Sequence, residues 1–423
     1  MSQDATDTVS APGRVWHEPG FAAFLAARLA AVFAMQIQAV VVAWQVYDIT
    51  RDPLSLAWVG LAQFIPMLFL LLPAGDLVDR YSRKRILLLS WGVQALCSGM
   101  LLYLSLGEHD VVYYYLVLVL FGCGRAFTGP TLQSLLPQIV PRVQLARAIA
   151  VNSMIMKIAV IGGPLIGGVL YALGGSWAYA VCLGCFLVAM LMLLPVPVLY
   201  ASKILPTAQT AWERFTAGIL FIRSRPIILG AISLDLFAVL LGGVVALLPI
   251  YAQEVLHVGP EGLGALRSAV AVGALLMGIY LSTRALTRHV GLVMFIAVAV
   301  FGVANLVFAF STLFWVSLVA MLVAGAADMI SVYIRTTLIQ LATPDEMRGR
   351  VNAVNMLFIG SSNELGEFRA GTTAAWLGTI PAAVMGGVAT LAVVAGWMWG
   401  FKPLRQVDRF ADVEPTRDKA DRS

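Results

Sequence analysis

The stretch VGLVMFIAVAVFGVANLVFAF, residues 290–310, contains no charged residue and sets the scale of the whole chain. As a helix, a run of about 20 apolar residues spans the roughly 30 Å hydrocarbon core of a bilayer. Comparable runs occupy residues 86–106 and 111–121. Hydrophobic residues make up 60% of the 423 residues and charged residues 12%, with a mean hydropathy of +0.86. Since a soluble domain usually carries about 25% charged residues, the composition predicts an all-α membrane protein.

The same length criterion predicts twelve transmembrane helices, at 20–47, 54–74, 86–106, 111–137, 144–173, 177–199, 226–252, 261–283, 289–310, 312–340, 349–373 and 380–401. Lys and Arg between these helices gather in the loops of one side, and the loops of the other side contain only Arg51. Basic residues are enriched in cytoplasmic loops. Both termini are therefore expected in the cytoplasm, in a multi-pass protein of the cell (inner) membrane. Residues 1–19 show no cleaved signal peptide and are predicted to be a cytoplasmic tail, as are residues 402–423.

The longest polar connection between predicted helices is residues 200–225, near the middle of the chain. It divides the chain into a predicted N-terminal six-helix bundle, 20–199, and a C-terminal six-helix bundle, 226–401. Four apolar residues of the connection fall on one helical face: Trp212, Phe215, Ile219 and Ile222. This pattern favours a short amphipathic helix on the cytoplasmic membrane surface. An ordinary disordered linker is the alternative.

An internal repeat supports the division into halves. PRVQLARAIAVN (141–152) aligns with PDEMRGRVNAVN (344–355) at an offset of 203 residues, with five identical positions. The same offset pairs four glycines with four others: Gly75 with Gly278, Gly122 with Gly325, Gly163 with Gly366, and Gly168 with Gly371. Such a shared offset indicates two halves repeated in the same orientation. Parallel repeats related by an axis along the membrane normal are a transporter architecture, with the substrate site between the halves at mid-depth.

The loop GDLVDRYSRKR (75–85), between the second and third predicted helices, resembles the G-x-L-x-D-R-x-G-R-K signature of the major facilitator superfamily. The match consists of Gly75, Leu77, Asp79, Arg80, Arg83 and Lys84, with Ser82 in place of the usual glycine. Gly75 permits close helix approach, and Asp79 can form charge-assisted bonds. The resemblance implies a gate in which Asp79 and Arg83 latch the cytoplasmic ends of the bundles in the outward-open state. The alternative, a plain positive-inside cluster, leaves the Gly, Leu and Asp spacing unexplained. The second half keeps only Gly278 of the motif.

Two further segments are similar to motifs of this superfamily. Arg125, Thr128 and Gly129 resemble its R-x-x-q-G pattern, with Thr128 in place of glutamine. AVIGGPLIGG (159–168) resembles the g-x-x-x-G-P-x-x-G-G signature of proton-coupled drug exporters, through Gly163, Pro164, Gly167 and Gly168. Small residues at this spacing let helices touch backbone to backbone, so packing alone is the alternative to an export role. Over the whole chain, the resemblance is to the enterobactin-exporter branch of the superfamily.

Ionisable residues inside transmembrane helices are costly and usually face a cavity or a partner. The proton-coupling or cavity candidates are Asp235, Arg125, Asp328, Glu364 and Glu367. Asp235 is the first choice because it is the only charge between residues 226 and 251, so it must pair with a cation of another helix or carry a proton. Glu364 and Glu367 come second, because adjacent carboxylates favour protonation of one of them. Arg125 and Asp328 are equivalent under the 203-residue offset and are predicted to pair. A purely structural ion pair is the alternative for each residue.

The resemblance implies a secondary transporter that works by alternating access, with a proton gradient and no cofactor as its energy source. The expected cargo is a small amphipathic compound, drug-like or siderophore-like, moved outward; an uptake carrier or lipid flippase is the alternative. The sequence has no catalytic motif, metal-site pattern or Walker lysine loop, which argues against a membrane-embedded enzyme, and a receptor does not need the repeated halves. The expected partners are an unidentified small molecule and the lipid bilayer, without nucleic acid, and the chain is expected to be a monomer. Further polar or aromatic residues expected in the cavity are Gln36, Gln38, Trp44 and Asn363.

Overall fold

The structure is a computed structural model and describes residues 16, 18–199, 211–284 and 286–413. Within these ranges every regular element is helical. The predictions for most of the two tails and for residues 200–210 lie outside the described residues.

The long helices of the first half are α1 (Phe21–Thr50), α2 (Pro53–Arg80), α3 (Arg83–Ser105), α4 (Val111–Ile139), α5 (Arg142–Leu173) and α6 (Gly175–Leu193). A shorter helix, α7 (Ala211–Ser224), follows them. The elements of the second half are α8 (Pro226–Gly242), η2 (Val245–Leu247), α9 (Leu248–Ile250), η3 (Tyr251–Val255), α10 (Pro260–Thr283), α11 (Val290–Phe310), α12 (Phe314–Ala342), α13 (Asp345–Leu377), α14 (Thr379–Gly400), α15 (Lys402–Arg405) and η4 (Phe410–Val413).

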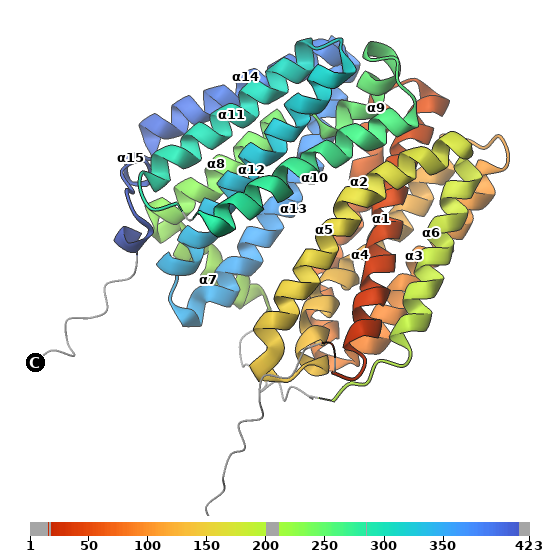
Figure 1. Cartoon of the computed structure of the whole chain (residues 1–423), viewed down its shortest axis with the longest axis horizontal. Helices are drawn as coiled ribbons and strands as arrows, with labels where there is room; N and C mark the ends of the chain where they lie inside the picture. Colours follow the sequence, from red (N-terminus) through yellow and green to blue (C-terminus); the bar gives the residue numbers. More distant parts are fainter. Residues whose placement is uncertain (1–15, 17, 200–210, 285, 414–423) are drawn as a thin grey trace, which may run out of the picture.

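The long helices form two bundles side by side, α1–α6 and α8–α14 (Figure 1). Eleven segments of the described residues are long and apolar enough to cross a membrane, with α8 to η3 counted as one segment. The twelfth crossing is α13, which is long enough to span a membrane at 33 residues but is more polar than the other eleven. Its charged residues are Asp345, Glu346, Arg348, Arg350, Glu364, Glu367 and Arg369. The predicted twelve-helix fold is confirmed.

The seventh crossing is broken, so the prediction of one continuous helix over 226–252 is wrong. α8 ends at Gly242, and Gly243 takes an extended conformation, with φ −61° and ψ 124°. Neighbouring helices bond the carbonyl groups at the break. Asn305 Nδ2 donates to the Gly242 oxygen over 3.1 Å, and Arg369 Nη2 donates to the Gly243 oxygen over 3.4 Å. A break at membrane depth is tolerated because these side chains replace the missing helical hydrogen bonds.

The two bundles repeat the same packing. α1 packs on α5 and α6 as α8 packs on α13 and α14, and α4 packs on α2 and α3 as α12 packs on α10 and α11. Paired glycines lie at equivalent contacts. Gly122 faces the backbone of Gln63 on α2, and Gly325 faces the backbone of Val270 on α10, with no room for a side chain at either glycine. The structure therefore has the repeat that the 203-residue offset predicts for α4 and α12.

The second helix of each half follows a different offset. Gln63 and Val270, which occupy equivalent contacts, are 207 residues apart. The second half therefore has four more residues before its second helix. They fall within residues 243–259, where η2, α9, η3 and a longer connection replace the end of α1 and its short turn. The predicted pairing of Gly75 with Gly278 is wrong for this reason, because the structural counterpart of Gly75 is Ser282.

Two helix pairs join the bundles: α5 packs on α10, and α2 packs on α13. Gly168 on α5 lies against the backbone of Pro260, the first residue of α10. Gly371 on α13 lies against the backbone of Pro53, the first residue of α2, where an added Cβ would come within 3.0 Å of its oxygen. These two glycines form the same contact on the two sides of the pseudo-symmetry axis.

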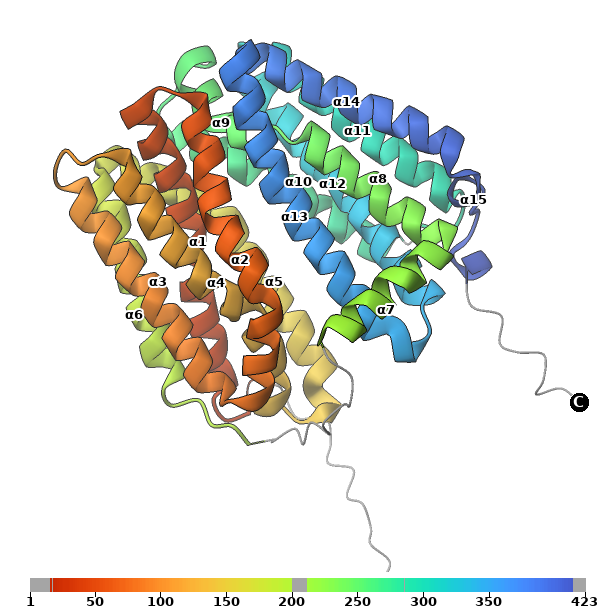
Figure 2. The same ribbon diagram turned by 180° about the vertical axis from the view of Figure 1, so that it is seen from behind.

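The bundles are also bonded at the end where α1 finishes, which we call the loop end. Tyr47 Oη donates to a Glu254 carboxylate oxygen, and Arg51 Nη1 donates to Gln253 Oε1 over 2.7 Å. At the opposite end, where α1 begins and α14 finishes, the ribbons of the two bundles diverge in both views (Figures 1 and 2). The polar bonds at the loop end therefore hold together bundles that separate toward the other end.

The helix α7 packs on the C-terminal bundle. Ile222 is buried, and Phe215 and Ile219 are half-buried in a cluster with residues of α8 and α13. Gly218 touches the backbone of Arg350 on α13. Of the predicted apolar face only Trp212 is exposed, at 62%. The apolar face is therefore covered mainly by protein, and not by a membrane surface as the sequence predicts.

We expect Gly325→Ala to destabilise the chain by about 1–3 kcal/mol, the usual cost of adding atoms to a packed site. A Cβ at residue 325 would overlap the backbone of Val270. A lower melting temperature of the purified chain in detergent would report the loss. Gly396→Ala is the matched control, because nothing lies within 4 Å of a Cβ added there. Equal melting temperatures for the two variants would contradict the close contact.

Candidate transport site

A polar cavity of 230 Å³ lies between the two bundles. Its lining comes from α1, α2 and α4 on one side, and from η2, α10 and α13 on the other. The polar lining residues are Gln36, Gln38, Gln63, Arg125, Arg267, Glu364 and Glu367. The rest of the lining is apolar and includes Met35, Leu118 and Phe121. Ligand pockets commonly hold about 300–1,000 Å³, so in this conformation the cavity accommodates a small molecule or one end of a larger one.

Arg125 and Glu364 form an ion pair across the cavity. Arg125 Nη1 on α4 lies 3.3 Å from Glu364 Oε1 on α13, so the pair joins the two bundles. The predicted pairing of Arg125 with Asp328 is wrong, because α13 and not α12 presents its carboxylate to α4. The equivalent positions of two residues in a repeat do not place them in contact.

Glu367 lies one helical turn from Glu364 on the cavity side of α13. Gly60 on α2 leaves the space beside it, since a Cβ at residue 60 would lie 3.7 Å from Glu367 Oε2. Within the described residues no hydrogen bond or ion pair holds this carboxylate; its interactions with Arg267 and Arg125 are electrostatic only. The two glutamates therefore have different surroundings, one bonded to a cation and one not.

Arg267 on α10 is a cavity residue that the sequence predictions missed. It is a single basic residue within an apolar helix, the same signal that identifies Asp235, and could have been found by that signal. Gln63 was also missed, because one glutamine in a helix carries no such signal. Of the polar residues predicted from α1, Gln36 and Gln38 line the cavity.

Asp235 is paired inside the C-terminal bundle and does not belong to the cavity lining. Its carboxylate bonds Arg335 on α12, and Ser331 Oγ donates to Asp235 Oδ1 over 3.4 Å. The Arg335 and Asp235 side chains are only 4% and 7% exposed. Of the two states predicted for Asp235, the structure has the one in which a cation of another helix neutralises it.

Asp328 lies close enough to this pair to interact with it electrostatically. Asp235 and Arg335 both act on its carboxylate, and so does Lys157 of α5 in the other bundle. Asp328 has no bonded partner among the described residues. Asp235 and Asp328, together with Arg335, form a second cluster of charged residues, which we call the acidic cluster. It is separate from the cavity glutamates, and Lys157 of the other bundle interacts with it electrostatically.

The loop-signature residues lie where α2 ends and α3 begins. An added Cβ at Gly75 would meet nothing within 4 Å, so the predicted close helix approach at this glycine is absent in this conformation. Lys84 Nζ donates to the Leu194 and Val196 oxygens over 2.6 and 2.8 Å, which ties α3 to the end of α6. Ser82 has φ −62°, which any residue adopts, so the missing glycine causes no strain. Leu77 and Arg80 are exposed, and the side chain of Asp79 lies outside the described residues.

The fifth-helix motif lies in the helix contacts. Gly163 packs on Gln36 of α1, and an added Cβ at Gly167 would lie 3.1 Å from the backbone of Ile37. The backbone of Pro164 faces Gly264 of α10, next to the contact of Gly168 described above. The motif thus joins α5 to its own bundle on one face and to the other bundle on the second face.

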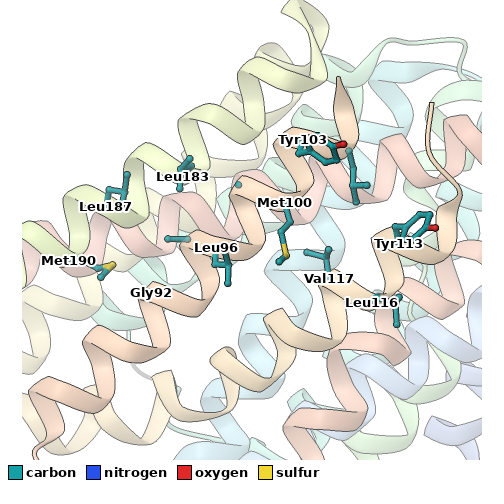
Figure 3. Close-up of a pocket in the computed structure, with 13 residues that line it drawn as sticks. Gly92, Leu96, Met100, Tyr103, Tyr113, Leu116, Val117, Leu183, Leu187 and Met190 are labelled. Atoms are coloured by element: carbon teal, nitrogen blue, oxygen red, sulfur yellow. The ribbon is translucent and has the colours of Figure 1, made fainter. Parts of the chain in front are cut away.

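A larger hollow of 640 Å³ lies on the outer surface of the N-terminal bundle (Figure 3). Figure 3 shows its lining from α3, α4 and α6, with no charged side chain: Gly92, Leu96, Met100, Tyr103, Tyr113, Leu116, Val117, Leu183, Leu187 and Met190 among the labelled residues. A similar hollow of 670 Å³ lies between α11 and α12. Because the linings of both hollows are almost wholly apolar and contain no charged side chain, the smaller central cavity remains the candidate transport site.

Two matched six-helix bundles around a polar cavity define the major facilitator fold. A family match over nearly the whole chain makes the protein a secondary transporter of this superfamily, a transport protein and not an enzyme. The chain belongs to the transmembrane secretion effector family of this superfamily, whose model matches residues 14–419. Multi-pass membrane insertion follows from this membership.

Curated relatives include enterobactin exporters. The chain is 26% identical over 342 residues to the enterobactin exporter EntS of Citrobacter koseri, covering 79% of this chain and 80% of that protein. It is 25% identical over 350 residues to EntS of Shigella dysenteriae serotype 1, with the same coverage. The predicted resemblance to the enterobactin-exporter branch is confirmed.

Solved structures show the same fold at low identity. A bacterial homologue of the lysosomal transporter Spinster, in an inward-facing conformation, superposes with a TM-score of 0.70 at 14% identity, over 91% of this chain and 95% of that chain. The nucleoside transporter NupG gives a TM-score of 0.70 at 13% identity, over 90% of this chain and 99% of that chain.

Proposed function

We propose that the chain is a proton-coupled exporter that moves a small amphipathic compound out of the cell by alternating access. The observation that carries the proposal is the central cavity, where a cation of one bundle bonds a carboxylate of the other. The relatives named for enterobactin export support outward transport of a siderophore-like cargo. In the proposed orientation both termini lie in the cytoplasm, and the loop end faces the outside of the cell.

The proton site of the proposal is the glutamate pair Glu364 and Glu367. Both line the cavity, where a substrate and a proton can influence one another. Asp235, the first choice from sequence, has its charge neutralised by Arg335 away from the cavity lining. Asp235 and Asp328 form the second candidate site, because Lys157 acts on Asp328 from the other bundle and this interaction changes when the bundles move.

Alternating access requires the loop-end bonds to break when the opposite end closes. In the present conformation Tyr47–Glu254 and Arg51–Gln253 bond the bundles at the loop end. The loop-signature residues then serve the outward-open state, in which Asp79 and Arg83 latch the cytoplasmic ends. The open space beside Gly75 fits a motif that is disengaged in this conformation.

The test uses inside-out membrane vesicles that contain the full chain. An acidic lumen should drive accumulation of enterobactin or another amphipathic compound from the outside, and a protonophore should abolish it. Vesicles without the chain give the background. If the wild type accumulates the compound without dependence on the pH gradient, the antiport claim is removed. If the same gradient instead drives the compound out of the vesicle lumen, which corresponds to movement into the cell, the chain is an uptake carrier.

A further inference from the structure

Arg267 is one of the arginines that lie deep in a crossing helix, at least seven residues from either end, in the described part of the chain. It differs from the others of this group in its bonding. Those arginines all have a hydrogen-bonded partner: Arg28 bonds Asn152, Arg125 bonds Glu364, Arg335 bonds Asp235, and Arg369 bonds the Gly243 oxygen. No hydrogen bond or ion pair of the described residues reaches Arg267. Its Nε is buried without an acceptor, as is the Nε of Arg28, Arg335 and Arg369, but only Arg267 also lacks a bond from its other nitrogens. Its interaction with Glu367 is electrostatic only.

The unbonded guanidinium belongs to the cavity lining. A buried donor without an acceptor is unfavourable, and a buried cation without a bonded anion is more so. Gln38 adds a second donor to the same lining, because its Oε1 accepts from Ser98 over 2.7 Å while its Nε2 is buried without a partner. Two buried donors of this lining, Arg267 Nε and Gln38 Nε2, therefore lack acceptors. A ligand with acceptor groups beside them would supply the missing partners.

We infer that Arg267 is the binding residue for an acidic group of the substrate, and that the substrate class is amphipathic organic anions. A guanidinium bonds two oxygens of one carboxylate or a similar group through its planar fork, which a neutral amide cannot reproduce. Met35, Leu118 and Phe121 supply the apolar lining for the rest of the molecule. Glu367 and the substrate anion then share one cation, Arg267.

The inference rests on the proposed exporter and names its cargo, but its test needs no transport. Binding of 2-naphthoate and of its neutral counterpart 2-naphthamide is measured by titration calorimetry, with the full chain in detergent. The wild type should bind the carboxylate about tenfold or more tightly than the amide. Arg267→Gln should lose this preference, with the affinity for the amide unchanged, and Arg267→Lys should keep part of it, because it keeps the charge but not the fork.

Arg28→Gln is the matched control, since Arg28 is also inside a crossing helix but is bonded to Asn152 and does not line the cavity. It should bind both probes as the wild type does. Equal wild-type affinities for carboxylate and amide, or no carboxylate binding at all, would overturn the inference even if the Arg267 variants failed to fold. Carboxylate binding that Arg267→Gln leaves intact would overturn it too. If the anion binds but accumulation ignores the pH gradient, only the proposed proton coupling is lost.

Discussion

Replacing Glu367 by glutamine is expected to reduce accumulation driven by a pH gradient by about tenfold or more, while exchange of labelled for unlabelled substrate continues. Glutamine keeps the shape of the side chain but cannot bind and release a proton, so the coupled step is lost and the movement of the bundles is kept. Glu364 is held by Arg125 at 3.3 Å, whereas Glu367 has no bonded cation in the described chain. Glu367 is therefore the carboxyl free to exchange its proton, a role typical of ionisable groups inside membranes.

The measurement compares accumulation driven by the pH gradient with exchange of labelled for unlabelled substrate, both in one preparation of vesicles. Glu108→Gln, in the exposed turn between α3 and α4, is the control for loss of a glutamate and should keep full gradient dependence. If Glu367→Gln retained that dependence while Asp328→Asn abolished it, the proton site would move to the acidic cluster of α8 and α12. If both variants retained it, neither cluster would carry the proton.

Arg335→Ala should lower the free energy of unfolding by about 3–5 kcal/mol, because it leaves the buried carboxylate of Asp235 without its cation. The two side chains are 4% and 7% exposed, so water cannot replace the lost partner. Thermal unfolding of the purified chain in one detergent measures the change. The double variant Asp235→Leu with Arg335→Met should recover most of the loss, since an apolar pair of similar volume removes both buried charges.

Arg409→Ala is the control for loss of a surface arginine. Arg409 lies 3.8 Å from Asp408, with side chains 56% and 47% exposed, and such pairs are worth about 0–1 kcal/mol. A similar melting temperature for Arg335→Ala and Arg409→Ala would contradict a structural role for the buried pair. A double variant as unstable as Arg335→Ala would show that the two charges do more than neutralise each other.

The crossing helices are predictable from sequence because each one must satisfy its own backbone within the bilayer. Length and hydropathy therefore place α1 to α6 and α10 to α14 within a few residues of most of their observed ends. Even α13, the least apolar of them, is found because residues 351–363 are uncharged and its repeat partner is α5. The seventh crossing is the exception, since its break depends on Asn305 and Arg369 from other helices, which satisfy carbonyl groups that local sequence leaves open.

Patterns along the chain are enough to establish the membrane class, the number of helices, their repetition and the superfamily. Which charges meet depends instead on how the helices pack. The 203-residue offset makes Arg125 and Asp328 equivalent, but the pseudo-symmetry axis places Glu364 of α13 opposite Arg125. Asp235 has the same sequence signal as Arg267, yet one is neutralised within its bundle and the other lines the cavity unbonded. A charge in a membrane helix is costly wherever it lies, so its presence indicates a partner or a cavity without distinguishing the two.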